Sequence, residues 1–184
     1  MRILAISGSL RHGSLNTSLL RAAEELLSPL DTFELWDGLR EVPPYDQDDD
    51  VEPAPPAVAA LRAAVASADA VLIATPEYNS SIPGALKNAL DWASRPLASN
   101  PFRNKPVAVI GSSAGMFGAV WAQAELRKVL AAMGARVTEV EVAVGRAAEK
   151  FDADGRLTDE GVRQELRDAL ATLAVETVPV SVAA

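Results

Sequence analysis

The feature that most constrains the fold is the repeated alternation of short apolar runs with amphipathic segments along the 184 residues. Continuous apolar runs such as "RILAIS" and "DAVLIATP" are typical of strands buried on both faces of a parallel sheet. The pattern predicts strands over 2–7, 32–36, 69–76, 106–113 and 136–143, and helices over 16–27, 57–67, 83–93, 118–133 and 160–175. It therefore predicts an α/β fold, a doubly wound parallel sheet with right-handed crossovers and helices on both faces.

The length predicts a single domain over residues 1–184, with 176–184 as a loosely held tail. A net charge of −8 argues against nucleic-acid binding, because phosphate backbones need a basic face. The absence of cysteine excludes disulfides, thiolate nucleophiles and cysteine metal sites. No apolar run is long enough for a signal peptide or a membrane span, so we expect a cytoplasmic protein without a membrane partner.

Three loops of unusual composition follow three of the predicted strands. Open α/β sheets bind their ligands at the carboxyl ends of the strands, around the point where the strand order reverses. The loops that begin after Ser7, Thr75 and Ile110 all reach that edge and are rich in small polar residues. The sequence therefore predicts one ligand site built from these three loops.

The first loop, "GSLRHGSLNT" over residues 8–17, leads directly into a helix. A helix N-terminus offers free backbone N–H groups and a partial positive charge, which favour an anion. Hydroxyl, amide and guanidinium donors surround this helix start: Ser9, Arg11, Ser14, Asn16 and Thr17. They predict a phosphate site. The alternative is a plain strand–helix turn capped by Asn16 or Ser14.

Several other phosphate chemistries are excluded by the same loop. Gly8 and Gly13 have the spacing of a Walker loop, but Ser14 stands where its lysine is needed. The dinucleotide pattern G-x-G-x-x-G is absent, and a tyrosine-phosphatase loop needs a cysteine. The loop is thus suited to hold a phosphate monoester without cleaving it. His12, at the loop tip, is interpreted as solvated.

The second and third loops suit a flat heterocycle. In "TPEYNSSIPG", the segment Glu77–Asn79 offers backbone amides, and Tyr78 offers a ring; an ordinary surface loop is the alternative. In "GSSAGMFG", over 111–118, glycines permit close approach of the backbone and serines add donors without bulk.

Four other features are interpreted as structural. We expect the acidic run 45–52 to be a solvated loop, not a cation site, and 152–155 to be a turn. Trp92 is assigned to the core or to a subunit interface. Arg95 could contact an anionic substrate, although a solvated arginine is the simpler interpretation.

The chain resembles the NADPH-dependent FMN reductases over roughly residues 2–175. The segments that carry the resemblance are "GSLRHGSLN", "TPEYNSSIPGALKNALDWASRP", "GSSAGMFGA" and "FDADGRLTDE". The second is long and specific. The resemblance implies a flavodoxin-like sheet of five strands in the order 2-1-3-4-5.

The resemblance also implies FMN bound across the three loops. The phosphate would be held by Ser9, Arg11, Ser14, Asn16 and Thr17, and the ring would lie between Pro76, Glu77, Tyr78 and Asn79 on one side and Ser112, Ser113 and Gly115 on the other. No metal site is expected. Because the flavin performs the redox chemistry, no side chain is expected to be catalytic.

The implied activity is transfer of hydride from NADPH or NADH through FMN to a small acceptor such as a quinone, an azo compound or chromate. The resemblance further implies a homodimer or homotetramer. A flavodoxin-type electron carrier, which binds FMN without NAD(P)H turnover, is the alternative. A non-redox binder of phosphorylated metabolites is a third possibility, and would be colourless.

Overall fold

A parallel sheet forms the centre of the molecule in a computed structural model that describes residues 1–177. The strands are β1 (Arg2–Ser7), β2 (Thr32–Trp36), β3 (Ala70–Thr75), β4 (Pro106–Ser112), β5 (Arg136–Val137) and β6 (Val142–Val144). Their order is β2-β1-β3-β4-β5, and β6 also pairs with β4. The predicted fold class and strand order are confirmed.

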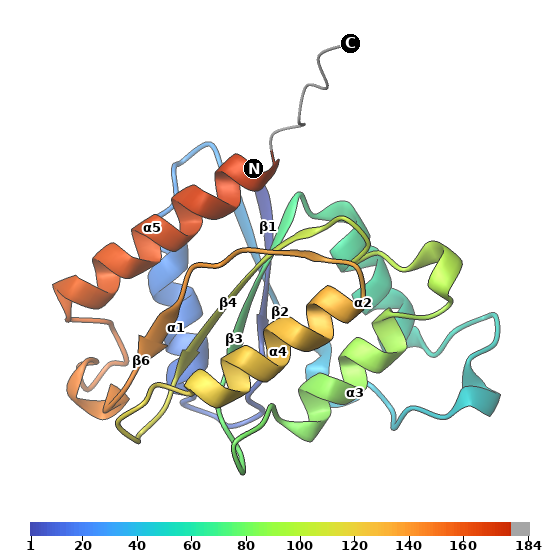
Figure 1. Cartoon of the computed structure of the whole chain (residues 1–184), viewed down its shortest axis with the longest axis horizontal. Helices are drawn as coiled ribbons and strands as arrows, with labels where there is room; N and C mark the ends of the chain where they lie inside the picture. Colours follow the sequence, from blue (N-terminus) through green and yellow to red (C-terminus); the bar gives the residue numbers. More distant parts are fainter. Residues whose placement is uncertain (178–184) are drawn as a thin grey trace.

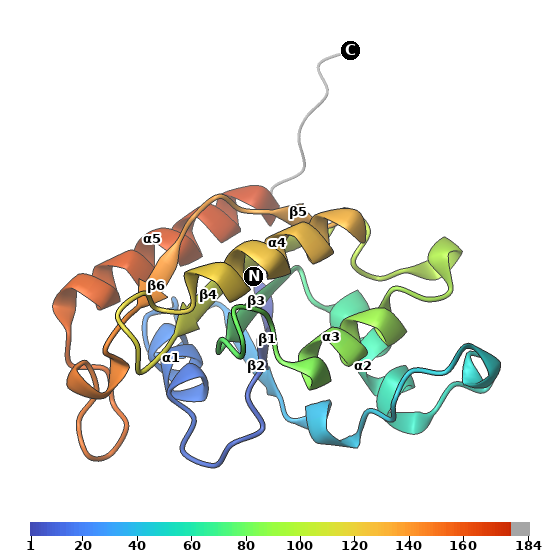
Figure 2. The same ribbon diagram turned by 60° about the horizontal axis from the view of Figure 1, so that its bottom comes forward.

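Helices cover both faces of the sheet (Figures 1 and 2). They are α1 (Leu15–Glu24), α2 (Pro56–Ser67), α3 (Gly84–Ala93), α4 (Val120–Ala132) and α5 (Glu160–Thr177). α1 and α5 pack on one face, and α2, α3 and α4 pack on the other. Short 3₁₀ turns lie at Gly38–Glu41, Gln47–Asp49, Leu97–Ser99 and Ala147–Glu149.

The strand sequences explain why two layers of helices are needed. Along β1, Leu4 and Ile6 enter the core beneath α2–α4, while Ile3 and Ala5 enter the core beneath α1 and α5. Alternate residues of a strand point to opposite faces, so an uninterrupted apolar strand requires cover on both sides. Trp92 is fully buried in the first of these cores, which confirms the core interpretation of that residue.

Several helix boundaries differ from the prediction by one to three residues, and two of these differences have a clear cause in the backbone. The helix expected over 16–27 ends at Glu24, because the N–H groups of Leu26 and Leu27 bond three residues back instead of four and tighten the chain into a 3₁₀ turn. The helix expected from residue 118 starts at Val120, because Gly118 and Ala119 have positive φ angles of 59° and 63°.

The strand expected over 136–143 is interrupted between β5 and β6. The Arg127 guanidinium of α4 reaches into this gap, where its Nη2 donates to the carbonyls of Val109 (3.2 Å) and Val140 (2.8 Å). A side chain thus replaces the ladder bonds of the missing strand residues. Burial lowers the pKa of Arg127, and the nearby Glu141 carboxylate partly opposes that shift.

The predicted tail and acidic loop are placed as follows. Residues 176 and 177 belong to the last turn of α5, and the rest of the expected tail, 178–184, lies outside the described residues. The loop that contains the acidic run is held against α3 by Asn88. The amide of Asn88 donates a hydrogen bond to the Pro43 carbonyl and accepts one from the Tyr45 N–H. Within residues 1–177, no three acidic or histidine side chains converge as a metal site would require, and no helix has the length and apolarity to cross a membrane.

Candidate functional site

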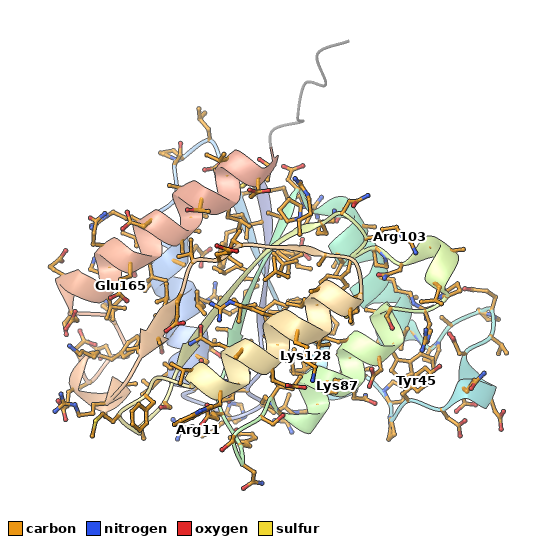
Figure 3. The ribbon with its side chains drawn as sticks, viewed as in Figure 1. Arg11, Tyr45, Lys87, Arg103, Lys128 and Glu165 are labelled. Carbon is orange, nitrogen blue, oxygen red and sulfur yellow. The ribbon has the colours of Figure 1, made fainter. Side chains whose placement is uncertain are left out.

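The loops that follow β1, β3 and β4 meet at one edge of the sheet, at the bottom of the view in Figure 1 and in front in Figure 2. Arg11 lies at this edge in Figure 3. The loops enclose a cavity of about 320 Å³, lined by Ser9, Arg11, Ser14, Leu15, Asn16, Pro76, Glu77, Tyr78, Ser112, Ser113 and Ala114. The structure therefore brings together nine of the twelve predicted residues around one cavity, while Thr17, Asn79 and Gly115 lie outside its lining.

The first loop presents the N-terminus of α1 to this cavity. The first bond of the helix runs from the N–H of Ser18 to the carbonyl of Ser14, which leaves the N–H groups of Leu15, Asn16 and Thr17 without intrahelical acceptors. Ser14 is buried at the N-cap position, yet its hydroxyl makes no capping bond. The Ser14 hydroxyl therefore remains available to a ligand at the start of α1.

The remaining donors of the first loop lie around the same helix start. The Arg11 guanidinium is folded back onto its own loop, where Nη2 donates to the Gly13 carbonyl at 2.9 Å. The Thr17 hydroxyl donates to Ser7 Oγ at 2.8 Å. Thr17 and His12 line a second cavity of about 210 Å³, together with Ser9 and Arg11. Arg11 therefore lines both this cavity and the cavity of about 320 Å³.

Asn16 has a structural role that the sequence did not reveal. Its amide Nδ2 donates to the Ser112 carbonyl at 3.0 Å, and its Oδ1 accepts from the Ser112 N–H at 2.9 Å. Both polar atoms of the amide are therefore occupied by the end of β4. The backbone N–H of Asn16 has no intrahelical acceptor, whereas its side chain already bonds Ser112, so contact of the Asn16 side chain with a phosphate stays a prediction.

The second loop is a tight hairpin. Tyr78 and Ser81 exchange both backbone bonds, at 3.0 and 3.1 Å, and Asn79 and Ser80 between them have φ angles of 53° and 60°. Two consecutive positive φ angles are the mark of a type I′ turn, which asparagine tolerates better than most residues. Asn79 is thus at the exposed tip of the turn, and Tyr78, with 53% of its surface exposed, stands at the edge of the cavity.

The third loop contains a buried hydroxyl group that has no hydrogen-bond partner among the described residues. This group is the Oγ of Ser112. A buried hydroxyl without a partner costs free energy unless something at the site satisfies it. Ser112 lines the cavity, so a ligand with a polar edge would supply the missing bond.

The chain segment beyond β6 holds the third loop from behind. Ser113 N–H donates to the Val144 carbonyl, and Gly115 accepts from the Arg146 N–H at 2.8 Å. Gly145 lets the two segments touch, because a Cβ built there would lie 2.0 Å from the Met116 carbonyl oxygen. Gly115 therefore supports the loop from outside the cavity lining.

Arg95 lies in a different place from the three loops. It borders a cavity of about 760 Å³ between α3 and α4, together with Lys87 and Lys128, which are labelled on these two helices in Figure 3. The structure does not bring Arg95 into the lining of the loop cavity.

The donor set of the loop cavity fits FMN. The free N–H groups of α1 and the Ser14 hydroxyl suit a phosphate, and the unpartnered Ser112 Oγ suits the polar edge of a heterocycle. Among the residues that line the cavity, Tyr78 alone is aromatic. The wall beside a bound ring would therefore be mostly small and polar.

Comparisons with known proteins agree with this geometry. Residues 1–149 match the family model of the NADPH-dependent FMN reductases. An NAD(P)H-dependent FMN reductase from Pseudomonas aeruginosa is 44% identical over 174 residues, covering 94% of this chain and 93% of that protein. A 2-hydroxy-1,4-benzoquinone reductase from a Burkholderia species is 38% identical, covering 91% of each chain.

The structural comparison extends over the same length of chain. FerB, a flavoenzyme NAD(P)H:(acceptor) oxidoreductase from Paracoccus denitrificans, superimposes with a TM-score of 0.85 at 36% sequence identity. The match covers 95% of this chain and 98% of FerB.

Proposed function

Because this chain belongs to the NADPH-dependent FMN reductase family, we propose that it is an FMN-dependent oxidoreductase that uses NADPH or NADH to reduce a small acceptor. We propose further that the acceptor is a quinone, since relatives of similar length act on quinones. The single observation that carries the FMN site is the convergence of free α1 N–H groups and the unpartnered Ser112 hydroxyl on one cavity.

Each loop has a separate task in this proposal. The N–H groups of Leu15, Asn16 and Thr17 bind the phosphate, with Ser14 and Ser9 as hydroxyl donors. Arg11 leaves the Gly13 carbonyl, its partner in the structure, and pairs with the phosphate charge. Tyr78 lies along the ring, and the Ser112 and Ser113 end of β4 bonds the polar edge of the ring.

The chemistry that FMN would supply in this cavity is hydride and electron transfer between the nicotinamide and the acceptor. The protein's own contribution is to bind FMN, to orient its ring and to leave one side of that ring accessible. No acid, base or nucleophile is assigned, because the cavity lining contains no histidine, lysine or cysteine and its one carboxylate, Glu77, is engaged with backbone N–H groups. An open ring favours turnover with small molecules over the tight aromatic enclosure expected of an electron carrier.

The activity is tested by steady-state oxidation of NADPH with FMN-loaded protein and 1,4-benzoquinone. We expect turnover that depends on both FMN and the quinone. Intact FMN binding without oxidation of NADPH or NADH would favour the flavodoxin-type electron carrier. A colourless protein that does not bind added FMN would favour the non-redox binder of phosphorylated metabolites.

Three further properties belong to the same proposal. We place the whole chain, 1–184, in one FMN-binding domain. We expect a homodimer or homotetramer, supported by the exposed apolar side chains of Met116, Phe117 and Trp121 beside the cavity. Light scattering after size-exclusion chromatography measures the mass of the particle in solution. A monomer at all protein concentrations would contradict the expected homodimer or homotetramer. We also propose a cytoplasmic location, where NAD(P)H is available, to be tested by cell fractionation.

A further inference from the structure

The carboxylate of Glu77 joins the second loop to the helix that follows the third. A single oxygen, Oε2, accepts from the backbone N–H groups of Trp121 and Ala122, both at 3.1 Å. These groups lie in the first turn of α4, where N–H groups have no intrahelical acceptor. Ala119 occupies the N-cap position with a φ of 63° and has no side-chain oxygen to offer. Glu77 therefore supplies, from 44 residues earlier in the chain, the cap that α4 lacks.

This contact completes the anchoring of the third loop. The loop leaves β4 at Ser112, which Asn16 holds by two bonds. It is supported from behind by the residues that follow β6 and enters α4 at the helix turn held by Glu77. Each end of the third loop is thus fixed by a side chain from one of the other two loops. Removing the Glu77 contact would free the end that carries Phe117 and Trp121.

Glu77 also brings a negative charge to the cavity. It lines the cavity beside Tyr78, and no lysine or arginine forms an ion pair with it within residues 1–177. The peptide dipoles at the start of α4 oppose this charge only in part, because a helix terminus carries about half an elementary charge. A flavin gains electrons on reduction, so an uncompensated carboxylate nearby disfavours the reduced form more than the oxidised form.

We propose that Glu77 is a positioning residue with two separable effects. Its hydrogen bonds to α4 fix the third loop against the FMN ring, and its charge lowers the affinity for reduced FMN relative to oxidised FMN. This inference rests on the proposed binding of FMN in the cavity.

The two effects can be separated by two variants. Because one oxygen accepts both bonds, the amide oxygen of Glu77→Gln can replace it, so this variant removes the charge and keeps the cap. Glu77→Ala removes both. The matched control is Glu125→Gln, which removes an exposed carboxylate further along the same helix, where it pairs with Lys128 and lines the cavity between α3 and α4.

The readouts are thermal unfolding of the apoprotein, the Kd for oxidised FMN, and the midpoint potential of bound FMN. For Glu77→Gln we expect near wild-type unfolding and Kd. We expect its affinity for reduced over oxidised FMN to rise about fivefold, an upward shift of ~20 mV for a two-electron couple. For Glu77→Ala we expect unfolding about 3 °C lower and a Kd raised about fivefold or more. Glu125→Gln should change none of these quantities.

The outcomes distinguish this inference from the proposed function. Failure of the wild-type protein to bind FMN would overturn both. Normal FMN binding, with an unchanged potential in Glu77→Gln and an unchanged Kd in Glu77→Ala, would overturn the role of Glu77 alone. If Glu77→Ala does not fold, the cap is essential, and the potential of Glu77→Gln decides the role of the charge.

Discussion

The side-chain amide of Asn16 and the backbone of Ser112 form a closed pair of hydrogen bonds between residues 96 positions apart. Nδ2 donates to the carbonyl at 3.0 Å and Oδ1 accepts from the N–H at 2.9 Å, with both residues buried. The pair joins the start of α1 to the end of β4. The two loops that would hold the phosphate and the ring are therefore held at a fixed separation before any ligand binds.

We expect Asn16→Ala to destabilise the protein and weaken FMN binding. Two buried backbone groups lose their partners, which should lower the free energy of unfolding by about 2–4 kcal/mol in urea titrations. Asn88→Ala is a matched control, because the Asn88 side chain also donates one bond and accepts one, but does not line the cavity. The control should lose stability and keep the wild-type Kd for FMN. Equal effects of both variants on that Kd would contradict the role assigned to Asn16.

Arg11→Ala tests the phosphate site. The loss of a charged hydrogen bond should weaken FMN binding by at least about 1.5 kcal/mol, while riboflavin, which has no phosphate, should bind almost unchanged. Flavin fluorescence titrations measure both. Arg2→Ala is the control, since Arg2 is an exposed arginine that is paired with Glu34 at the opposite end of β1. Similar weakening of FMN and riboflavin by Arg11→Ala would refute the phosphate assignment.

Ser112→Ala tests the contact with the ring. The hydroxyl has no partner in the described part of the chain, so its removal should leave the apoprotein as stable or slightly more stable. Binding of both FMN and riboflavin should weaken by about 1 kcal/mol, because each ligand has the same ring.

Thr138→Val is the matched control for that experiment. Thr138 also has a buried hydroxyl without a partner, but it does not line the cavity. It should keep the wild-type affinity for both flavins. Unchanged flavin binding in Ser112→Ala would show that the ring does not use this hydroxyl.

The sequence was sufficient to predict the architecture, because strands that are buried on both faces appear in it as continuous apolar runs. β1, with Ile3 and Ala5 on one face and Leu4 and Ile6 on the other, is an example. The interruption between β5 and β6 could not be predicted, since it depends on the Arg127 guanidinium reaching across from α4. A run of residues with strand propensity does not show that a side chain from another element will take the place of the backbone hydrogen bonds between two strands.

The candidate site was predictable to the level of loops and less so to the level of side-chain roles. The donors around α1 predicted a phosphate site, and Ser9, Arg11 and Ser14 line one cavity in the structure. They did not reveal that Asn16 is engaged with Ser112, because that contact joins distant parts of the chain. The contact of Glu77 with α4 was hidden for the same reason, because it joins residues 44 positions apart.

Acid should destabilise the protein through Asp159, which lies just before α5. The bond from Lys150 and the N–H of Val162, which donates to Oδ1 at 3.0 Å, lower the pKa of this carboxyl from 3.8. A lowered folded-state pKa contributes stability that is fully present above the unfolded pKa, near 4, and is lost as the pH falls through the folded value.

Asp159→Asn removes this ionisation and should flatten the fall of the thermal midpoint as the pH drops below about 4. Asp168→Asn, which removes an exposed carboxylate of α5 bonded to Gln164, is the comparison. If Asp159→Asn retained the full wild-type loss of stability in acid, the pairing with Lys150 would contribute nothing measurable.

The measurement that tests the central claim most directly is the visible spectrum of the purified protein, followed by mass identification of the molecule released on denaturation and by reconstitution of the apoprotein with FMN. The account predicts a yellow protein that releases FMN and takes it up again in an equimolar amount. A colourless protein that also fails to take up added FMN would contradict it.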